Sequence, residues 1–189
     1  MHGLLDTPAV FNPLKRELAG RRDPLLTPAI PLRLGRTPVL HAAEQLANRI
    51  ESSFGREQAI DVLGFSMGGV IARCWIQLMG GATRVRRFIS VGSPQQGTIT
   101  ARPWPRRMFR GIADLQAGSE LMRELNRDLR PLQRIDCLSF YSPLDLVVLP
   151  GWRAVLPVGP RKLVPVLTHP QLLWDRAAVH LLARELLRF

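Results

Sequence analysis

The chain has 189 residues, of which 46% are hydrophobic, and a formal net charge of +11 at pH 7. This length is typical of one domain with a sizeable core, so we expect a single domain over residues 1–189. No run approaches the roughly 20 apolar residues that cross a bilayer, and residues 1–11 lack the pattern of a signal peptide. We therefore expect a cytoplasmic protein, with any contact to a membrane being peripheral.

Short apolar runs alternate with amphipathic runs along the chain, which is the pattern of an α/β fold with a mostly parallel sheet flanked by helices. The clearest helix signal is the recurrence of apolar residues at three- and four-residue spacing over 39–54. The elements predicted for the first half are a helix over 9–20, a strand over 29–34, a helix over 39–54, a strand over 59–64, a helix over 67–79 and a strand over 85–91.

Residues 95–133 interrupt this alternation and include a predicted helix over 119–129. We interpret this stretch as a lid-like excursion over the top of the sheet. The chain then resumes with a strand over 135–141, a strand over 163–167 and a closing helix over 171–187.

The cysteines and basic residues exclude several classes of function. Cys74 and Cys137 lie in apolar segments and are expected to be buried free thiols, which favours a reducing compartment. The histidines and cysteines have no zinc-like spacing, so we expect no metal site. Lysine occurs only at Lys15 and Lys162, and the many arginines are scattered without interleaved aromatic residues. This pattern disfavours nucleic acid as a partner.

The motif Gly64-Phe65-Ser66-Met67-Gly68 matches the G-x-S-x-G nucleophile elbow. In such an elbow a serine lies on a sharp strand-to-helix turn, and the flanking glycines keep side chains out of the crowded turn. An apolar strand is predicted before the motif and a helix after it, as the elbow requires. The alternative is a glycine-rich turn that contains an incidental serine.

A serine hydroxyl needs a base that takes its proton, and in this arrangement the order along the chain is Ser, then Asp or Glu, then His. His169 follows a predicted strand, whereas His180 lies inside the closing helix. Asp145 follows the strand over 135–141, so both loops are expected at the carboxyl edge of the sheet, beside Ser66. The alternatives are a helix-start histidine at position 169 and an ordinary turn aspartate at position 145.

Other carboxylates are less suited to the role of the acid. Asp136 begins its strand and so lies at the wrong end, while Asp114 and Glu120 in the excursion are reserve candidates. An oxyanion needs two backbone N–H donors, one of which comes from the residue after the nucleophile, here Met67. The other comes from an early loop, where His2-Gly3 makes Leu4 the second predicted donor.

Taken together, these motifs resemble the bacterial triacylglycerol lipase and esterase group of the α/β-hydrolase superfamily, over almost the whole chain. The resemblance rests on segments that occur in the group's order: His2 to Leu5, Gly64 to Gly69, Ser93 to Thr98, Asp114 to Asn126, Tyr141 to Val148 and Leu167 to His169. It implies a Ser66-Asp145-His169 triad that needs no cofactor. Gln95 or Gln96 stands where the group commonly has a histidine, and neither is assigned a role.

One departure from the group concerns the first core strand. In the group an apolar strand leads directly into the His-Gly motif, but here the sequence begins at Met1-His2. We expect this strand to be missing from the sheet, which would leave strand edges exposed. Our hypothesis is that the true start lies upstream of Met1.

The predicted reaction is hydrolysis of carboxylic esters, lipids among them, through an acyl-enzyme. The excursion carries apolar residues beside Arg102, Arg106, Arg107 and Arg110, which suits a lid that meets an anionic lipid surface. The alternative is a solvated basic helix packed on the sheet. For the whole chain, the rivals are a thioesterase or acyltransferase on the same fold, and a disabled hydrolase-fold protein that binds a partner or lipid.

Overall fold

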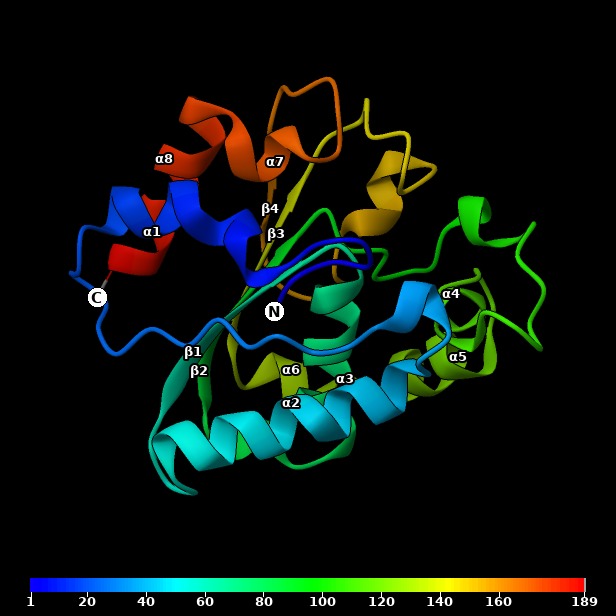
Figure 1. The fold of residues 1–189 in the computed structure, drawn as a ribbon, viewed down its shortest axis with the longest axis horizontal. Coiled ribbons are helices and arrows are strands. Elements are labelled where there is room, and N and C mark those ends of the chain that lie inside the picture. Colours follow the sequence, from blue (N-terminus) through cyan, green and yellow to red (C-terminus); the bar gives the residue numbers. More distant parts are fainter. Residues whose placement is uncertain (189) are drawn as a thin grey trace.

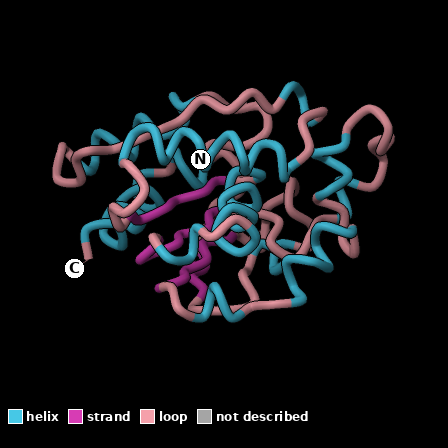
Figure 2. The backbone as a smooth tube through the Cα atoms, turned by 90° about the horizontal axis from the view of Figure 1, so that it is seen from below, coloured by secondary structure: helices cyan, strands magenta, loops and turns pink. Residues whose placement is uncertain are grey.

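The computed structural model describes residues 1–188, so Phe189 lies outside the described residues. Within that range the fold is built on a parallel sheet of four strands in the order β1-β2-β3-β4. The strands are β1 Ile60–Phe65, β2 Val85–Val91, β3 Asp136–Tyr141 and β4 Arg161–Leu163. Figures 1 and 2 show these strands side by side in the interior, enclosed by helices.

Helices cover both faces of the sheet (Figure 1). The helices α1 (Asn12–Leu18) and α8 (Arg176–Leu187) pack on one face, and α2 (Val39–Phe54) and α3 (Met67–Leu78) pack on the other. Each face has its own cluster of buried apolar side chains. The shorter elements are η1 Pro8–Phe11, η2 Arg33–Gly35, η3 Gly81–Thr83, η4 Ile99–Ala101, α4 Arg110–Asp114, α5 Glu120–Arg127, α6 Arg130–Gln133, η5 Gly151–Ala154 and α7 Gln171–Trp174.

The predicted α/β fold with a parallel sheet is confirmed, and two elements have the predicted bounds. Helix α2 spans 39–54 because its apolar residues recur on one face and are buried there. Strand β2 spans 85–91, and its apolar residues are buried between β1 and β3, as in a parallel sheet covered on both faces, while Arg86 near its amino end is exposed. Cys74 and Cys137 are free buried thiols, as predicted, and burial raises the pKa of each to about 12.

The strand predicted over 29–34 is wrong. Pro28 and Pro31 have no backbone N–H to donate to a sheet. Between them, Ile30 N–H donates instead to His2 Nε2 at 3.2 Å. This segment is therefore irregular chain that leads into η2, and Ile30 and Leu32 fill the core without joining the sheet, whereas Leu34 is exposed.

The last strand and the closing helix also differ from the prediction. Strand β4 covers Arg161–Leu163 and not 163–167: Val164 N–H still bonds Tyr141 O, but Val166 N–H then turns back to Val164 O at 2.9 Å, and the pairing ends. The predicted helix over 171–187 is divided by Asp175, which has an extended ψ of 133°. Its carboxylate accepts Ala178 N–H at 3.0 Å and so caps α8.

The excursion over 95–133 contains η4, α4, α5 and α6. Ser119 caps α5 by accepting Met122 N–H at 3.2 Å, in agreement with the predicted start of this helix. Four of the apolar residues that the excursion contributes are buried in the core and cannot meet a lipid surface: Ile112, Leu115, Leu121 and Met122.

A buried arginine joins the excursion to the sheet domain. Arg73 of α3 is fully buried and donates to Gln95 O and Leu125 O, each at 2.8 Å, and to Asn126 Oδ1 at 3.0 Å. Burial lowers its pKa to about 10. These bonds satisfy the guanidinium with neutral acceptors, so one side chain fixes the end of α5 and the loop after β2 against α3.

The outer edge of β1 is partly occupied by the first residue of the chain. The Met1 amino group donates to Leu63 O at 2.7 Å, and Met1 O accepts Phe65 N–H at 3.0 Å, which is the pattern of a parallel bridge. Beyond Met1, a cavity of about 250 Å³ runs along the edge, with Ile60 and Val62 in its wall. As predicted, the four-stranded sheet of residues 1–188 has no strand that leads into the His2-Gly3 motif. Met1 occupies one position at the edge of β1, where that strand would lie.

The buried amino group at Met1 generates a prediction about stability. Burial lowers its pKa from 8.0 to about 5, so between these values the unfolded chain binds a proton that the folded chain does not. The free energy of unfolding should therefore rise as the pH increases from about 5 to 8. N-terminal acetylation keeps an N–H for Leu63 O but removes the titrating charge, and the cavity beside Met1 has room for the acetyl group.

We expect the acetylated chain to be more stable than the unmodified chain at pH 5, by roughly 2–4 kcal/mol, with the difference shrinking toward pH 8. Urea unfolding of both forms across this pH range measures it. A difference that does not change with pH contradicts the burial of a neutral amine.

Candidate active site

Ser66 lies on the turn between β1 and α3 with φ 53° and ψ −132°, a strained backbone for a residue with a side chain. Its N–H is held by Val91 O at 2.9 Å. The glycines on either side are required by close contacts. A methyl group on Gly64 would lie 2.4 Å from Gly69 Cα, and one on Gly68 would lie 2.3 Å from His2 O. The predicted motif therefore has the strand–turn–helix geometry of a nucleophile elbow.

Asp145 and His169 lie next to each other. Asp145 is 1% exposed, and its Oδ2 is 2.6 Å from His169 Nδ1. Its other oxygen accepts Val147 N–H at 2.8 Å and Val148 N–H at 3.2 Å. A buried carboxylate with three such bonds can orient the imidazole and stabilise its charged form.

His169 is held by its surroundings with Nε2 turned away from Asp145. Its ring stacks on Phe65, the residue before Ser66, with centroids 4.8 Å apart. Gly92 has φ 52°, and a methyl group there would lie 3.1 Å from His169 Cε1. Within residues 1–188, the buried Nε2 has no hydrogen-bond partner, so Ser66 Oγ does not donate to it in this conformation. Such bonds often tighten only when substrate is bound.

The loop at His2–Leu4 lies against the nucleophile. A methyl group on Gly3 would be 2.8 Å from Ser66 Cβ. Burial lowers the pKa of His2, which favours the neutral ring. In that form its Nδ1–H donates to Gly3 O at 2.9 Å while Nε2 accepts from Ile30. Leu4 N–H stays a predicted oxyanion donor, as does Met67 N–H, which lies in the first turn of α3 and has no intrahelical partner.

The other titratable candidates lie elsewhere. His180 is exposed on α8 and pairs with Glu17. Asp136, at the amino end of β3, pairs with Arg87 and Arg188. The reserve acids also have other positions: Asp114 accepts Val39 N–H at 2.9 Å, and Glu120 is an exposed first residue of α5.

Sequence reasoning assigned no role to the segment after β2, yet this segment supports the acid loop. Thr98 Oγ1 accepts Leu149 N–H at 2.9 Å, and Thr100 Oγ1 donates to Val147 O at 2.7 Å. Gln96 N–H bonds Arg153 O at 3.0 Å. The one available signal was that the segment Ser93 to Thr98 resembles the corresponding segment of the lipase and esterase group. That resemblance did not reveal which loop these residues hold.

No three His, Cys, Asp or Glu side chains gather as metal ligands would anywhere in residues 1–188. A serine hydroxyl, an imidazole, a carboxylate and backbone N–H groups, all present around Ser66, are groups that acid–base and nucleophilic chemistry uses. None of the helices in this part of the chain is long and apolar enough to cross a membrane.

Comparison with protein families identifies the chain. A family model described as palmitoyl protein thioesterase matches residues 35–131, slightly more than half of the sequence. The chain belongs to the palmitoyl protein thioesterase family. The matched segment includes Ser66 and ends before Asp145 and His169. A comparison with curated proteins gave no match.

Solved structures have the same fold as this family member. Lipase B of Aspergillus fumigatus has a TM-score of 0.72 and 18% identity, over 96% of this chain and 50% of the lipase, so the chain spans half of that protein. The mature lipase BlEst2 of Bacillus licheniformis has a TM-score of 0.72 and 14% identity, over 100% and 90%.

A structure reported for the metagenome-derived lipolytic enzymes LipS and LipT has a TM-score of 0.71 and 14% identity, over 99% of this chain and 91% of the other. The resemblance to lipases and esterases of the α/β-hydrolase superfamily is thus confirmed for the fold. The family model is described as a thioesterase, which is a class of hydrolase, so the family supports a hydrolase, while the solved structures show the fold.

Thr98→Val tests the support of the acid loop. The substitution keeps the shape of the side chain but leaves Leu149 N–H without its acceptor, so we expect a loss of stability of roughly 1–3 kcal/mol. Because the loop carries Asp145, kcat on an ester substrate should fall about tenfold or more. Thr83→Val, at an exposed turn away from this loop, is the matched control. Equal kinetics in the two variants would contradict the support.

Proposed function

We propose that this chain is a serine hydrolase that cleaves acyl esters and thioesters through an acyl-enzyme, with Ser66 as nucleophile, His169 as base and Asp145 as its acid partner. The observation that carries the proposal is the buried Asp145–His169 pair, 2.6 Å apart, whose ring stacks against the residue before a strained Ser66. Neither an acid nor a base of this kind is needed for folding alone, since a buried ionic pair contributes little net stability.

In the proposed reaction, Ser66 Oγ attacks the acyl carbonyl while His169 Nε2 takes the serine proton. Asp145 holds the imidazolium through Nδ1, and N–H groups of Met67 and Leu4 bind the oxyanion. The tetrahedral intermediate then expels the alcohol or thiol, which receives the proton from His169. Water then attacks the acyl-enzyme while His169 takes its proton. The bond between the acyl carbon and Ser66 Oγ breaks, Oγ receives that proton from His169, and the fatty acid leaves. The chain's own residues supply every group, so no cofactor enters the proposal.

The substrate proposed is a long acyl chain on an alcohol or a thiol. Large apolar side chains stand exposed beside the predicted catalytic residues along the chain: Leu5, Leu144, Leu146, Val147 and Leu167. Exposed apolar side chains in these loops suit an acyl chain or a lipid surface. The membership of the palmitoyl protein thioesterase family favours the thioester as a second substrate beside the lipid ester.

The first test compares p-nitrophenyl butyrate, p-nitrophenyl palmitate and a palmitoyl-cysteine peptide as substrates. We expect hydrolysis of the palmitoyl substrates, and a fall of about 10³-fold or more in Ser66→Ala. Ser53→Ala, on the exposed face of α2, is the matched control and should retain activity. Transfer of the acyl group to an added alcohol in preference to water would favour an acyltransferase.

A folded wild-type chain without activity on any of these substrates would reject the hydrolase and favour a binding protein with the hydrolase fold. Activity that survives Ser66→Ala would instead reject the assigned nucleophile.

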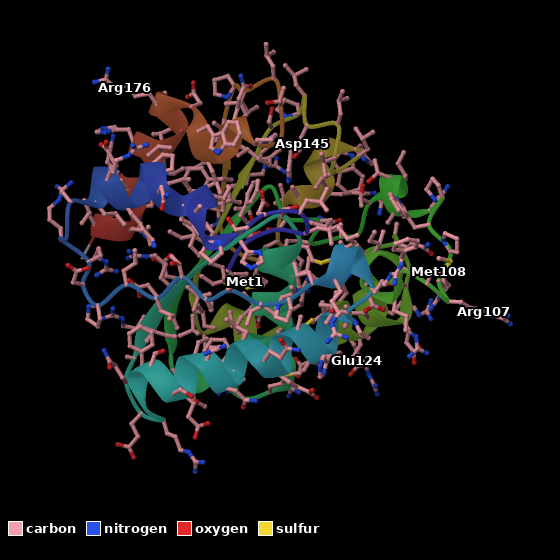
Figure 3. The ribbon with its side chains drawn as sticks, in the orientation of Figure 1. Met1, Arg107, Met108, Glu124, Asp145 and Arg176 are labelled. Atoms are coloured by element: carbon pink, nitrogen blue, oxygen red, sulfur yellow. The ribbon has the colours of Figure 1, made fainter. Side chains whose placement is uncertain are left out.

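We also propose that the excursion contacts an anionic lipid surface. Arg102, Arg106, Arg107 and Arg110 are exposed, and Trp104 and Met108 beside them are 44% and 54% exposed. Figure 3 shows Arg107 and Met108 at the outer rim of the molecule, well away from Asp145. Arginines that attract anionic headgroups and apolar side chains that enter the interface are the two components of peripheral binding. A cytoplasmic location remains a prediction from the two free thiols.

Replacing Arg106, Arg107 and Arg110 by Gln should weaken binding to phosphatidylglycerol vesicles by roughly 1 kcal/mol per arginine. Replacing Arg16, Arg49 and Arg134 by Gln removes the same charge from exposed positions elsewhere and should have a smaller effect. Vesicle co-sedimentation at 0.1 M salt measures both. An equal loss in the two triple variants would show that only net charge matters and would reject the excursion as the contact surface.

A further inference from the structure

Beside the proposed nucleophile lies a carboxylate to which neither the fold nor the proposed reaction gives a task. Gly3 separates it from Ser66: a methyl group on Gly3 would lie 2.5 Å from Asp6 Oδ2 and 3.4 Å from Ser66 Oγ. The two oxygens therefore flank the position from which a side chain at residue 3 would project, and only a glycine lets them approach it this closely. This space is on the side of Ser66 where the His2–Leu4 loop lies.

The Asp6 side chain is not used to hold the structure together. It is half-buried, and it forms no hydrogen bond or ion pair with any residue in the range 1–188. The backbone around it is nevertheless fixed, because Asp6 N–H bonds Gly3 O and the following turn η1 buries Phe11 in the core. A carboxylate that is held in position without a partner can interact with a bound molecule.

The charge of Asp6 is local and opposite to that of the whole chain, whose net charge is +11. Its influence reaches the neighbouring His2, where burial lowers the pKa and the Asp6 charge acts in the opposite direction. A negative charge beside the reacting carbonyl opposes the oxyanion in every substrate. It also attracts a cationic group and repels an anionic group that a substrate carries near that carbonyl.

We propose that Asp6 is a specificity-determining residue, which selects acyl esters and thioesters carrying a cationic group near the scissile carbonyl over those that are neutral or anionic. This rests on the proposed hydrolase function. Asp6 takes no part in bond making or breaking, and its effect is a difference between substrates. The ratio of kcat/KM for a cationic and a neutral substrate of the same shape isolates that difference, because the cost to the oxyanion is common to both.

Butyrylcholine and its uncharged isostere 3,3-dimethylbutyl butyrate form such a pair. In Asp6→Asn we expect the cationic-to-neutral ratio of kcat/KM to fall about fivefold, with the neutral ester hydrolysed somewhat faster than by wild type. The change in ratio should shrink in 1 M NaCl. Asp6→Glu keeps the charge and should keep most of the preference. Glu57→Gln removes an exposed carboxylate that precedes the amino end of β1, the end opposite to Ser66, and should leave the ratio unchanged.

The outcomes separate this proposal from the one on which it rests. Ser66-dependent hydrolysis with a ratio that is the same in wild type and Asp6→Asn overturns the role of Asp6 and leaves the hydrolase intact. A ratio that falls equally in Glu57→Gln also overturns it, since long-range charge alone would then explain the effect. A wild type that hydrolyses neither butyrate ester overturns the selection by Asp6, and it overturns the hydrolase as well only if the palmitoyl substrates are also left intact. Thermal unfolding of each variant confirms that the compared proteins are folded.

Discussion

The turn at Ser66 depends on backbone segments that approach each other with no side chain between them. Gly64 lies against Gly69 within the turn, and Gly68 lies against the carbonyl groups of Met1 and His2. The second contact matters beyond the turn, because it brings the start of the chain across the first turn of α3. Gly3 then reaches Ser66, and Asp6 follows it. The close backbone packing around the turn thus accompanies the strained φ of Ser66 and also brings Gly3 and Asp6 close to its hydroxyl.

The acid and the base come from other loops, and hydrogen bonds hold the acid loop in place. Asp145 is fixed by two N–H groups of its own loop, and that loop is fixed by Thr98 and Thr100 from the segment after β2. Asp145, Val148 and Thr98 are buried, so a missing partner at any of them would leave an unsatisfied polar atom in a region of low dielectric constant. The position of His169 therefore depends, through Asp145, on Thr98 and Thr100, which lie in the segment after β2.

The high positive charge of the chain has several separate causes in the structure. Arg73 is buried and bonds only neutral acceptors, and Arg87 links Asp136 to the end of α8. The arginines of the excursion are exposed and have apolar neighbours. A net charge cannot distinguish an arginine that ties helices together from one that faces solvent, which is why composition by itself pointed to no partner.

The sequence by itself determined the features whose signal is local. The apolar period of α2, the buried run of β2 and the glycines around Ser66 each report the conformation of one short segment, so the α/β fold and the elbow could be predicted. Only the tertiary structure decided which distant groups meet. Ile30 bonds His2 and joins no strand, Thr98 supports the acid loop, and Asp6 borders Ser66. The physical reason is that a hydrogen bond or a close contact between segments depends on how they pack, and a pattern within one segment carries no information about its partner.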